Sequence, residues 1–250
     1  ERMQYIGLLY LNVNQSEEVG LYPGDPNVLG ANRDGLSIMS LRVGMFETPN
    51  LPSLSFFAEA AHQRSSTGEQ RVDASAYNAE IGWSFADWPW RPRVLVRTAR
   101  YSGDPDRTDN IDRSWDPMFF TNNSFRGYGA SVHGEIVGQG FAFNSNLRVR
   151  SLGVQLQPAN DLRLHVLHYR FQWDQAAQFG GTDQALASET NVLVDWQPRR
   201  GMIVYAGLST AKPYAGAGEY FTAFGDGANA ALRAADQRIW RFHLGIEQQF

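Results

Sequence analysis

The chain has no cysteine among its 250 residues, which excludes a disulfide framework and a thiolate metal site. It also has no apolar run near the roughly 18 residues that a transmembrane helix requires. Lysine is almost absent: Lys212 is the single one, so the positive charge is nearly all arginine, which binds carboxylates and phosphates bidentately. The net charge of -4 is opposite to that of basic nucleic-acid-binding proteins, so no nucleic-acid partner is expected.

Residues 236–250 show the clearest pattern in the chain. Apolar side chains alternate with polar ones from Trp240 onward, which is the period of a β-strand with one apolar and one polar face. The apolar face could pack on a second sheet in a soluble sandwich or meet lipid in a membrane barrel. The apolar row of this strand is bulky and aromatic at its upper end, as in an interfacial girdle, which favours lipid. Aromatic residues make up 13% of the whole chain.

The same alternation recurs along the chain and predicts about ten strands. They cover residues 1–14, 34–46, 53–65, 72–86, 91–102, 145–157, 161–174, 188–197, 201–212 and 236–250. The pattern blurs at Tyr169–Trp173, where a bulge is expected, and 212–235 is predicted to be a Gly/Ala-rich loop. Long and short connections alternate, as in barrels with short periplasmic turns and long extracellular loops, whereas a soluble sandwich has no reason to sort its loops this way.

We therefore predict an all-β fold: an antiparallel transmembrane β-barrel forming one domain over residues 1–250, with a long extracellular loop near 103–144. Ten strands spaced about 4.8 Å apart and tilted about 40° close at a diameter of roughly 20 Å, which side chains nearly fill. About eighteen strands give roughly 36 Å, which leaves room for a polymer. We accordingly expect this chain to form the C-terminal part of a larger barrel.

Charged residues on the polar parity of the strands are predicted to face the lumen, because an arginine facing lipid at the midplane costs roughly 2–4 kcal/mol. The candidate substrate-binding residues are Arg42, Arg93, Arg97, Arg163, Arg241, Glu59, Glu80 and Asp195, with His165, His243 and Glu247 on the same parity. Two interpretations remain. The charges could pair across neighbouring strands and fill the interior, or the arginines could form repeated weak sites along which an acidic polymer slides.

The central loop carries the most specific motif. It contains Tyr101-Ser102-Gly103-Asp104 and then Trp115-Asp116-Pro117-Met118-Phe119. These segments resemble the YSGD…FDPLF pattern of the alginate export family of bacterial outer-membrane barrels, with Trp115 and Met118 in place of the usual Phe and Leu. The family's Gly-Glu-x-Asp strand opening is matched only by Glu189. Phe250 resembles the terminal aromatic of outer-membrane barrels, which implies contact of the last strand with the barrel assembly machinery.

The resemblance implies passive, non-enzymatic export of an anionic, alginate-like polysaccharide across a Gram-negative outer membrane, with outer-membrane lipid and lipopolysaccharide as partners. Arg148 and Arg150, on the lipid-facing parity near the outer rim, would suit lipopolysaccharide phosphates, although simple solvation explains them equally well. The first alternative is a general or solute-specific porin for small anionic solutes. The second is an outer-membrane barrel hydrolase, but the histidines are scattered and no G-x-S-x-G motif accompanies them.

No catalytic residue, cofactor or metal is expected. The acidic residues of the central loop could in principle bind Ca²⁺ through carboxylate oxygens. They are Asp104, Asp106, Asp109, Asp112 and Asp116. Their spacing matches no EF-hand loop, so a solvated loop is favoured.

Overall fold

The computed structural model describes residues 3–14, 33, 35–48, 51–65, 71–117, 134–142, 145–224 and 237–248. The ten long strands are β1 (Met3–Asn12), β2 (Ser37–Thr48), β3 (Leu51–Ser65), β4 (Arg71–Ser84), β5 (Arg93–Tyr101), β7 (Leu147–Ala159), β8 (Leu162–Trp173), β9 (Ala185–Arg199), β10 (Met202–Pro213) and β11 (Ile239–Gln248). The shorter elements are β6 (Ile111–Asp112), the π-helix η2 (Gly134–Ala142), the 3-10 helix η3 (Ala176–Phe179) and α1 (Ala215–Phe224).

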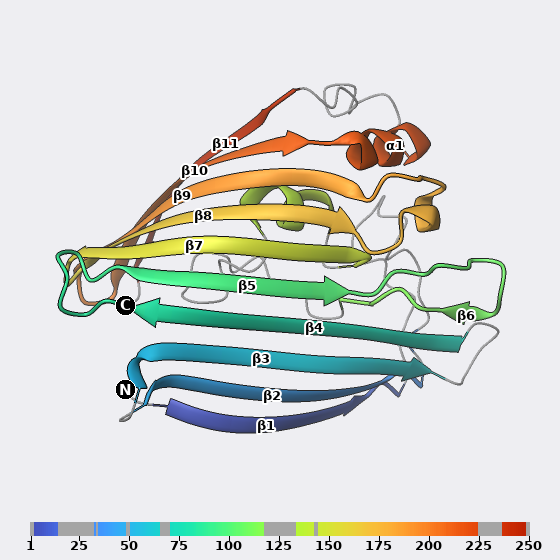
Figure 1. Ribbon diagram of the computed structural model, residues 1–250, viewed down its shortest axis with the longest axis horizontal. Helices are drawn as coiled ribbons and strands as arrows, with labels where there is room; N and C mark the ends of the chain where they lie inside the picture. The colour runs from blue at the N-terminus through green and yellow to red at the C-terminus, as the bar shows by residue number, and fades with distance from the viewer. Residues whose placement is uncertain are drawn as a thin grey trace.

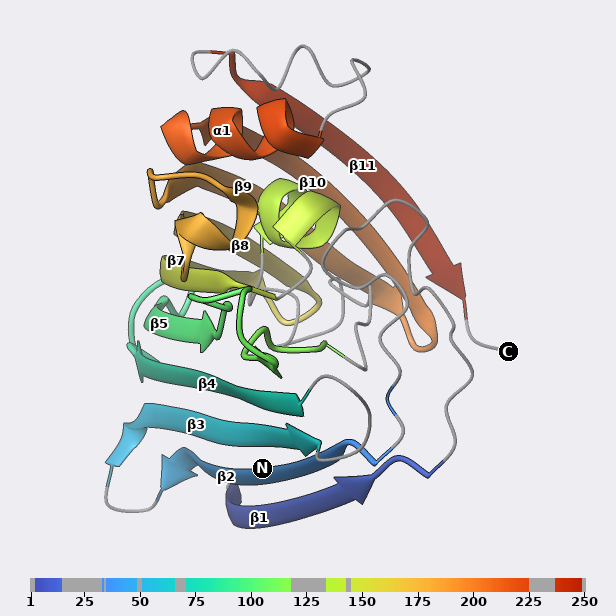
Figure 2. The same ribbon diagram turned by 90° about the vertical axis from the view of Figure 1, so that its right-hand side faces the viewer.

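The long strands form one antiparallel sheet in which each strand pairs with its neighbours in the chain, in the order β1-β2-β3-β4-β5-β7-β8-β9-β10-β11. β6 lies off this path and pairs in parallel with the start of β4. The sheet curves into a trough (Figures 1 and 2). Within the described strands no pairing joins β1 to β11, so the trough is open between these two edges. The predicted all-β class and the count of ten long strands are confirmed.

The connections separate by length between the two ends of the sheet. The turns β7–β8 and β9–β10 are two residues long and lie at one end, whereas η3, α1 and β6 lie at the other (Figure 1). The bulge expected in β8 lies in β9 instead: Phe171 pairs with Ala187 and Gln172 with Ala185, so Leu186 of β9 is the extra residue. Strand positions follow from the period-2 alternation, which only an extended chain can sort onto two faces.

One face of the sheet is apolar and open to the surroundings, and we call it the convex face. Ile6 is 81% exposed and Phe242 is 71% exposed. Other exposed apolar side chains of this face are Leu8, Tyr10, Met39, Leu41, Phe56, Tyr77, Ile81, Trp83, Val94, Val96, Leu152, Val166, Val192, Trp196, Leu208, Trp240, Leu244 and Ile246. Soluble monomers rarely expose a contiguous apolar patch larger than a few hundred Å². A face of this extent is suited to lipid.

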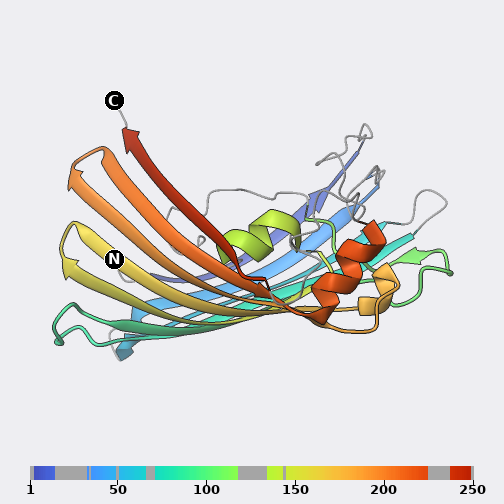
Figure 3. The same ribbon diagram turned by 90° about the horizontal axis from the view of Figure 1, so that it is seen from above.

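The opposite, concave face holds the packed core. The segment η2 lies inside the trough and packs against β9, β10 and β11 (Figures 2 and 3). Ile136 and Val137 of η2 are buried in a cluster of inward side chains. The cluster includes Leu95, Leu147, Val149, Leu167, Tyr169, Phe171, Trp173, Leu186 and Leu193. The aromatic run that blurs the alternation in β8 therefore supplies the core of this face.

The prediction of a plain loop over 212–235 is wrong in its first half, where α1 forms. Two glycines lower its helix propensity, so packing rather than sequence preference stabilises it. Tyr220 packs edge-on against Phe179 at a ring distance of 4.9 Å, and the indole N–H of Trp173 donates to the Gly216 carbonyl at 3.1 Å. In the described part of the chain no helix is both long enough and apolar enough to cross a bilayer.

Candidate functional site

The charged residues predicted to line the lumen do share one face. In the pairing register Glu80 lies opposite Arg97, Arg97 opposite Ser151, Ser151 opposite Tyr169, and Tyr169 opposite Glu189. Because directly paired residues point to the same side of a sheet, this row lies on the face that η2 covers. The other candidates join the face through the same register: Arg42, Glu59, Arg93, Arg163, Asp195 and Arg241.

Glu80 is the centre of a buried ionic network on β4 and β5. Its carboxylate accepts from Arg93 at 3.0 Å and makes a close ion pair with Arg97. Arg93 also donates to the Ser55 hydroxyl at 2.7 Å and to the Gln155 side-chain oxygen at 3.1 Å. Glu80 is only 4% exposed. Removing one partner of such a buried group leaves an uncompensated charge, so the network holds the strands together.

The remaining candidates are more open to solvent. Arg42 and Glu59 pair at 3.4 Å, with side chains 43% and 31% exposed, and Glu59 also accepts from the Ser40 hydroxyl at 2.6 Å. Asp195 contacts the His165 ring at 3.1 Å. Arg163 is exposed and lies opposite Asp195 in the register. Surface pairs of this kind contribute about 0–1 kcal/mol, so Arg42 and Arg163 are accessible to an incoming anion.

Glu189 on β9 anchors η2 to the concave face. Its carboxylate accepts the backbone N–H groups of Glu135, Ile136 and Val137 at 2.5, 3.0 and 2.8 Å. These amides lie at the N-terminus of η2, where helical N–H groups lack intrahelical partners and attract negative charge. Arg241 on β11 donates to the Glu135 carbonyl from the other side. Gly134 has a φ of 72°, and a Cβ there would lie 2.8 Å from the Glu189 carboxylate.

The side chain of Glu135 is fully buried, and neither of its carboxyl oxygens has a hydrogen-bond partner among the described residues. Burial raises the pKa of this carboxyl to about 7; Arg241 opposes the shift and the nearby Glu189 adds to it. Glu135 belongs to the connection between β5 and β7 and not to a strand. Near neutral pH, therefore, η2 carries a carboxyl that is poised between its neutral and charged forms.

The segment that follows β5 joins the ends of four strands. The Ser102 N–H donates to the Ser75 carbonyl of β4 at 2.9 Å, and the Ser102 hydroxyl accepts the Ser75 N–H at 2.9 Å. The Gly103 N–H donates to Asp174, just after β8, at 3.1 Å. A Cβ on Gly103 would lie 1.9 Å from Oδ1 of Asn146, the residue before β7, so only glycine fits at this position.

Asp116 anchors the far end of the same loop. Its backbone N–H donates to the Gln63 side-chain oxygen at 2.9 Å, and its carbonyl accepts from the Gln63 amide at 2.7 Å. Its carboxylate receives a bidentate contact from Arg33 at 2.5 and 2.7 Å. The loop is thus tied to β3 as well as to β4, β7 and β8. These contacts hold Ser102, Gly103 and Asp116 at this end of the sheet.

The acidic residues between these anchors form turns within the loop. Asp106, Asp109 and Asp112 each accept the backbone N–H two residues further on. Arg113 pairs with Asp109 at 2.8 Å. In the described ranges no cluster of three metal-ligating side chains occurs. Turn formation explains why aspartate recurs in this segment.

Asp174 lies just beyond β8 and also holds this end of the sheet together. It accepts from Arg100 at 2.7 and 2.9 Å and from Arg148 at 2.6 Å. Burial alone would raise the pKa of Asp174, but the hydrogen bonds from Arg100, Arg148 and the Gly103 amide outweigh it and hold the pKa below its usual value. The carboxylate is therefore ionised throughout the physiological range.

Residues 29–207, more than two thirds of the chain, match the protein family described as Alginate export. The chain belongs to the alginate export family. No curated protein matches the sequence at a significant level. Membership of this family and the antiparallel all-β sheet together support an outer-membrane barrel that takes part in polysaccharide transport.

The described residues of the two motif segments form hydrogen bonds at the end of the sheet where the long connections lie. Ser102, Gly103 and Asp104 contact the ends of neighbouring strands, and Asp104 donates its N–H to the Gln178 side chain at 2.8 Å. Trp115 donates its N–H to the Ser102 carbonyl at 2.9 Å, so the two halves of the motif meet. Tyr101 ends β5, and Pro117 is described, whereas Met118 and Phe119 lie outside the described residues, as does Phe250.

The sequence did not place two important carboxylates, Glu189 and Asp174, among the candidate site residues. Strand parity predicts that Glu189 points inward, because it has the same parity as Asn191 and Asp195. Nothing in the sequence indicates that its partner is η2. Asp174 had no signal of its own, since it follows a strand and its partners Arg100 and Arg148 lie on two others. Both depend on contacts between distant segments.

Proposed function

We propose that the protein is an outer-membrane channel for the passive, non-enzymatic export of an anionic polysaccharide through an arginine-lined lumen. The proposal is supported by one observation: arginines from several strands lie on the concave face of the sheet. The opposite face is suited to lipid, and the chain belongs to the alginate export family. Arginine binds carboxylates bidentately, and several weak sites in a row allow a uronate polymer to enter and leave.

The arginines divide into two groups by accessibility. Arg93 and Arg97 are buried against Glu80, so they maintain the wall. Arg163 and Arg42 are open to solvent, and these two are the better candidates for direct contact with the polymer. Arg241 is intermediate, because its guanidinium both lies near the solvent and holds η2.

Conductance of the full-length protein in planar bilayers tests the proposal. We expect an anion-selective current that polyuronate blocks and that a neutral polysaccharide of equal length does not. Arg163→Ala and Arg42→Ala should each weaken the block several-fold. The matched control is Arg199→Ala, an exposed arginine at the β9–β10 turn, which should leave the block unchanged.

A porin for small anionic solutes is the second candidate, and η2 favours it because the segment occupies part of the concave face. In that case the anion-selective current would persist, but polyuronate would not block it. Absence of any current would contradict both candidates and would favour a filled barrel.

A further inference from the structure

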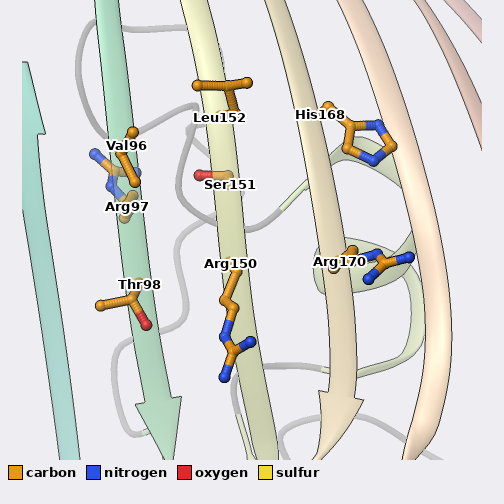
Figure 4. Close-up of a pocket in the computed structure, with 8 residues that line it drawn as sticks. All are labelled: Val96, Arg97, Thr98, Arg150, Ser151, Leu152, His168 and Arg170. Carbon is orange, nitrogen blue, oxygen red and sulfur yellow. The ribbon is translucent and has the colours of Figure 1, made fainter.

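The convex face carries a row of cations close to the end of the sheet where the long connections lie. In register across five strands this row reads Thr98, Arg150, Arg170, Ser188 and Lys212. Arg150, Arg170 and Lys212 are exposed, and we call these three residues the cationic row. Figure 4 shows Arg150 on β7 and Arg170 on the neighbouring strand β8. They point to the side opposite to the buried arginines of the concave face.

The cationic row lacks neutralising carboxylates. Among the described residues, none of its three members makes an ion pair with an acidic side chain. In the next row toward the loops, Arg100 and Arg148 share the single carboxylate of Asp174. The cationic row, together with Arg100 and Arg148, therefore has excess positive charge on a face that is otherwise largely apolar.

The polarity changes sharply in the opposite direction along the strands. The next row contains Val96, Leu152 and His168, which line a groove with a volume of about 320 Å³ (Figure 4). The row after that pairs Val94 with Val154 and Val154 with Val166. Each row is two residues further along a strand, so about 7 Å separates one row from the next. The cationic row and the apolar side chains Val94, Val96 and Leu152 of β5 and β7 thus lie within about 14 Å of each other.

This order of groups matches the order of groups in a lipid of the outer leaflet. An arginine on the lipid-facing side is costly at the midplane but costs only about 0–1 kcal/mol near the interface, where its guanidinium reaches the headgroups. Guanidinium groups bind phosphate bidentately. Barrels direct their long connections outward, so this end of the sheet meets the outer leaflet. Tyr77, in register with Arg100, adds an aromatic residue of the kind found at such interfaces.

We propose that the cationic row binds the phosphate groups of lipopolysaccharide, with one acyl chain lying in the groove beside Val96 and Leu152. The proposal rests on the outer-membrane location in the proposed function. Neighbouring strands are about 4.8 Å apart, so the row from β7 to β10 spans about 15 Å. A ligand with two phosphates on a disaccharide headgroup can occupy such a row, whereas a phospholipid presents a single phosphate.

Binding of rough lipopolysaccharide to the full-length protein in detergent tests this site. The variant Arg150→Gln/Arg170→Gln should bind at least ten-fold more weakly, and the charge-retaining Arg150→Lys/Arg170→Lys should keep most of the affinity. Arg199→Gln/Arg200→Gln, which removes two exposed arginines at the β9–β10 turn, is the matched control and should bind like the unaltered protein. Native mass spectrometry reports the bound lipid directly.

Further probes identify the source of the phosphate. Dephosphorylated lipopolysaccharide should bind the unaltered protein about as weakly as phosphorylated lipopolysaccharide binds the Gln variant. Phosphatidylglycerol and inorganic phosphate should compete only at much higher concentration. Equal binding of the phosphorylated and dephosphorylated forms would overturn the proposal, and this arm needs no variant to fold. Unchanged affinity in a correctly folded Gln variant would overturn it as well.

The same variants separate this site from the export function. Polyuronate block of the Gln variant in bilayers should match that of the unaltered protein, because Arg150 and Arg170 lie on the convex face. Phosphate-dependent lipid binding by a protein that shows no polymer block would contradict the export proposal and leave the lipid site standing.

Discussion

The two faces of the sheet use arginine in opposite ways. On the concave face Arg93 and Arg97 are buried against Glu80 and hold neighbouring strands together. On the convex face Arg150 and Arg170 are exposed and, among the described residues, have no carboxylate partner. The register places Arg97 opposite Ser151, the neighbour of Arg150, so the contrast arises within adjacent residues of adjacent strands. Parity decides which face of the sheet an arginine lies on.

This comparison separates charge that is needed for folding from charge that is available to a ligand. The buried carboxylate of Glu80 holds neighbouring strands together through its two guanidinium partners. It also neutralises part of their positive charge, so they attract a passing anion only weakly. Exposed arginines contribute little to stability, so their charge is available to a ligand or to solvent. Four experiments test this separation, beginning with the largest expected effect.

Glu80→Gln should break the buried network. The substitution removes the buried carboxylate that pairs with Arg93 and Arg97, and a loss of about 3–5 kcal/mol in the free energy of unfolding is expected. Urea unfolding of the refolded protein in detergent, followed by tryptophan fluorescence, measures it. The matched control Glu59→Gln, whose pair with Arg42 is open to solvent, should cost below about 1 kcal/mol. Equal losses in the two variants would contradict the contrast between buried and exposed pairs.

Glu189→Ala should release η2 from the concave face. The variant removes the acceptor of three backbone amides, and each buried donor left unsatisfied costs about 1–3 kcal/mol. Faster hydrogen exchange over residues 134–142 is the expected result, with the strands unaffected. Thr190→Ala, at the adjacent position on the convex face, is the control and should leave exchange in η2 unchanged. Unaltered protection in Glu189→Ala would mean that the apolar cluster alone holds the segment.

Asp174→Asn should weaken the rim by about 1.5–3 kcal/mol at neutral pH, the range for hydrogen bonds to charged groups. The folded-state pKa of Asp174 lies below 3.8, so the stability it contributes is present above that value and is lost as the pH falls through the folded-state pKa. The difference between the unaltered protein and the variant should therefore be full at pH 7 and should shrink below about pH 3.8. Unfolding free energies measured along this pH series report it, and a difference that does not vary with pH would contradict it.

A smaller effect is expected from the titration of Glu135. Its pKa of about 7 lies above the ordinary carboxyl value of 4.5, so docking of η2 is strongest below pH 4.5, weakens as the pH rises from there through about 7, and then levels off. Between pH 6 and 8 the loss should be about 1 kcal/mol. Hydrogen exchange in η2, corrected for the intrinsic rate, measures it. Glu135→Gln should abolish the pH dependence, and its persistence there would assign the titration to another group.

The strands were predictable because alternation is a local property. The polar neighbours of an apolar residue such as Leu244 show which face of the strand it lies on. The same period recurs in each strand, so the predicted strand boundaries agree with those in the structure to within a few residues. The break in the period at Tyr169–Trp173 predicted a bulge in β8, but the extra residue lies in the paired strand β9, and the sequence of β8 cannot show this. The inward charges followed from parity together with the cost of exposing arginine to lipid.

The elements between the strands were not predictable from local pattern. The helix α1 is rich in glycine and alanine, and its stability comes from Trp173 at the end of β8 and Phe179 in η3. The place of η2 depends on Glu189, more than fifty residues away. Which inward arginines are buried also depends on neighbouring strands, so Arg97 and Arg163 look alike in the sequence and differ in the fold.

The anchors of the central loop have a consequence for the order in which the protein assembles. Gly103 and Asp104 hold Asp174 and Gln178, partners that lie 71 and 74 positions further along the chain. These hydrogen bonds can form only after β8 has taken its place beside β7. The loop after β5 therefore closes late, once the strands on both of its sides have been inserted. An assembly intermediate stalled before β8 would lack the hydrogen bonds that hold Gly103 and Asp104.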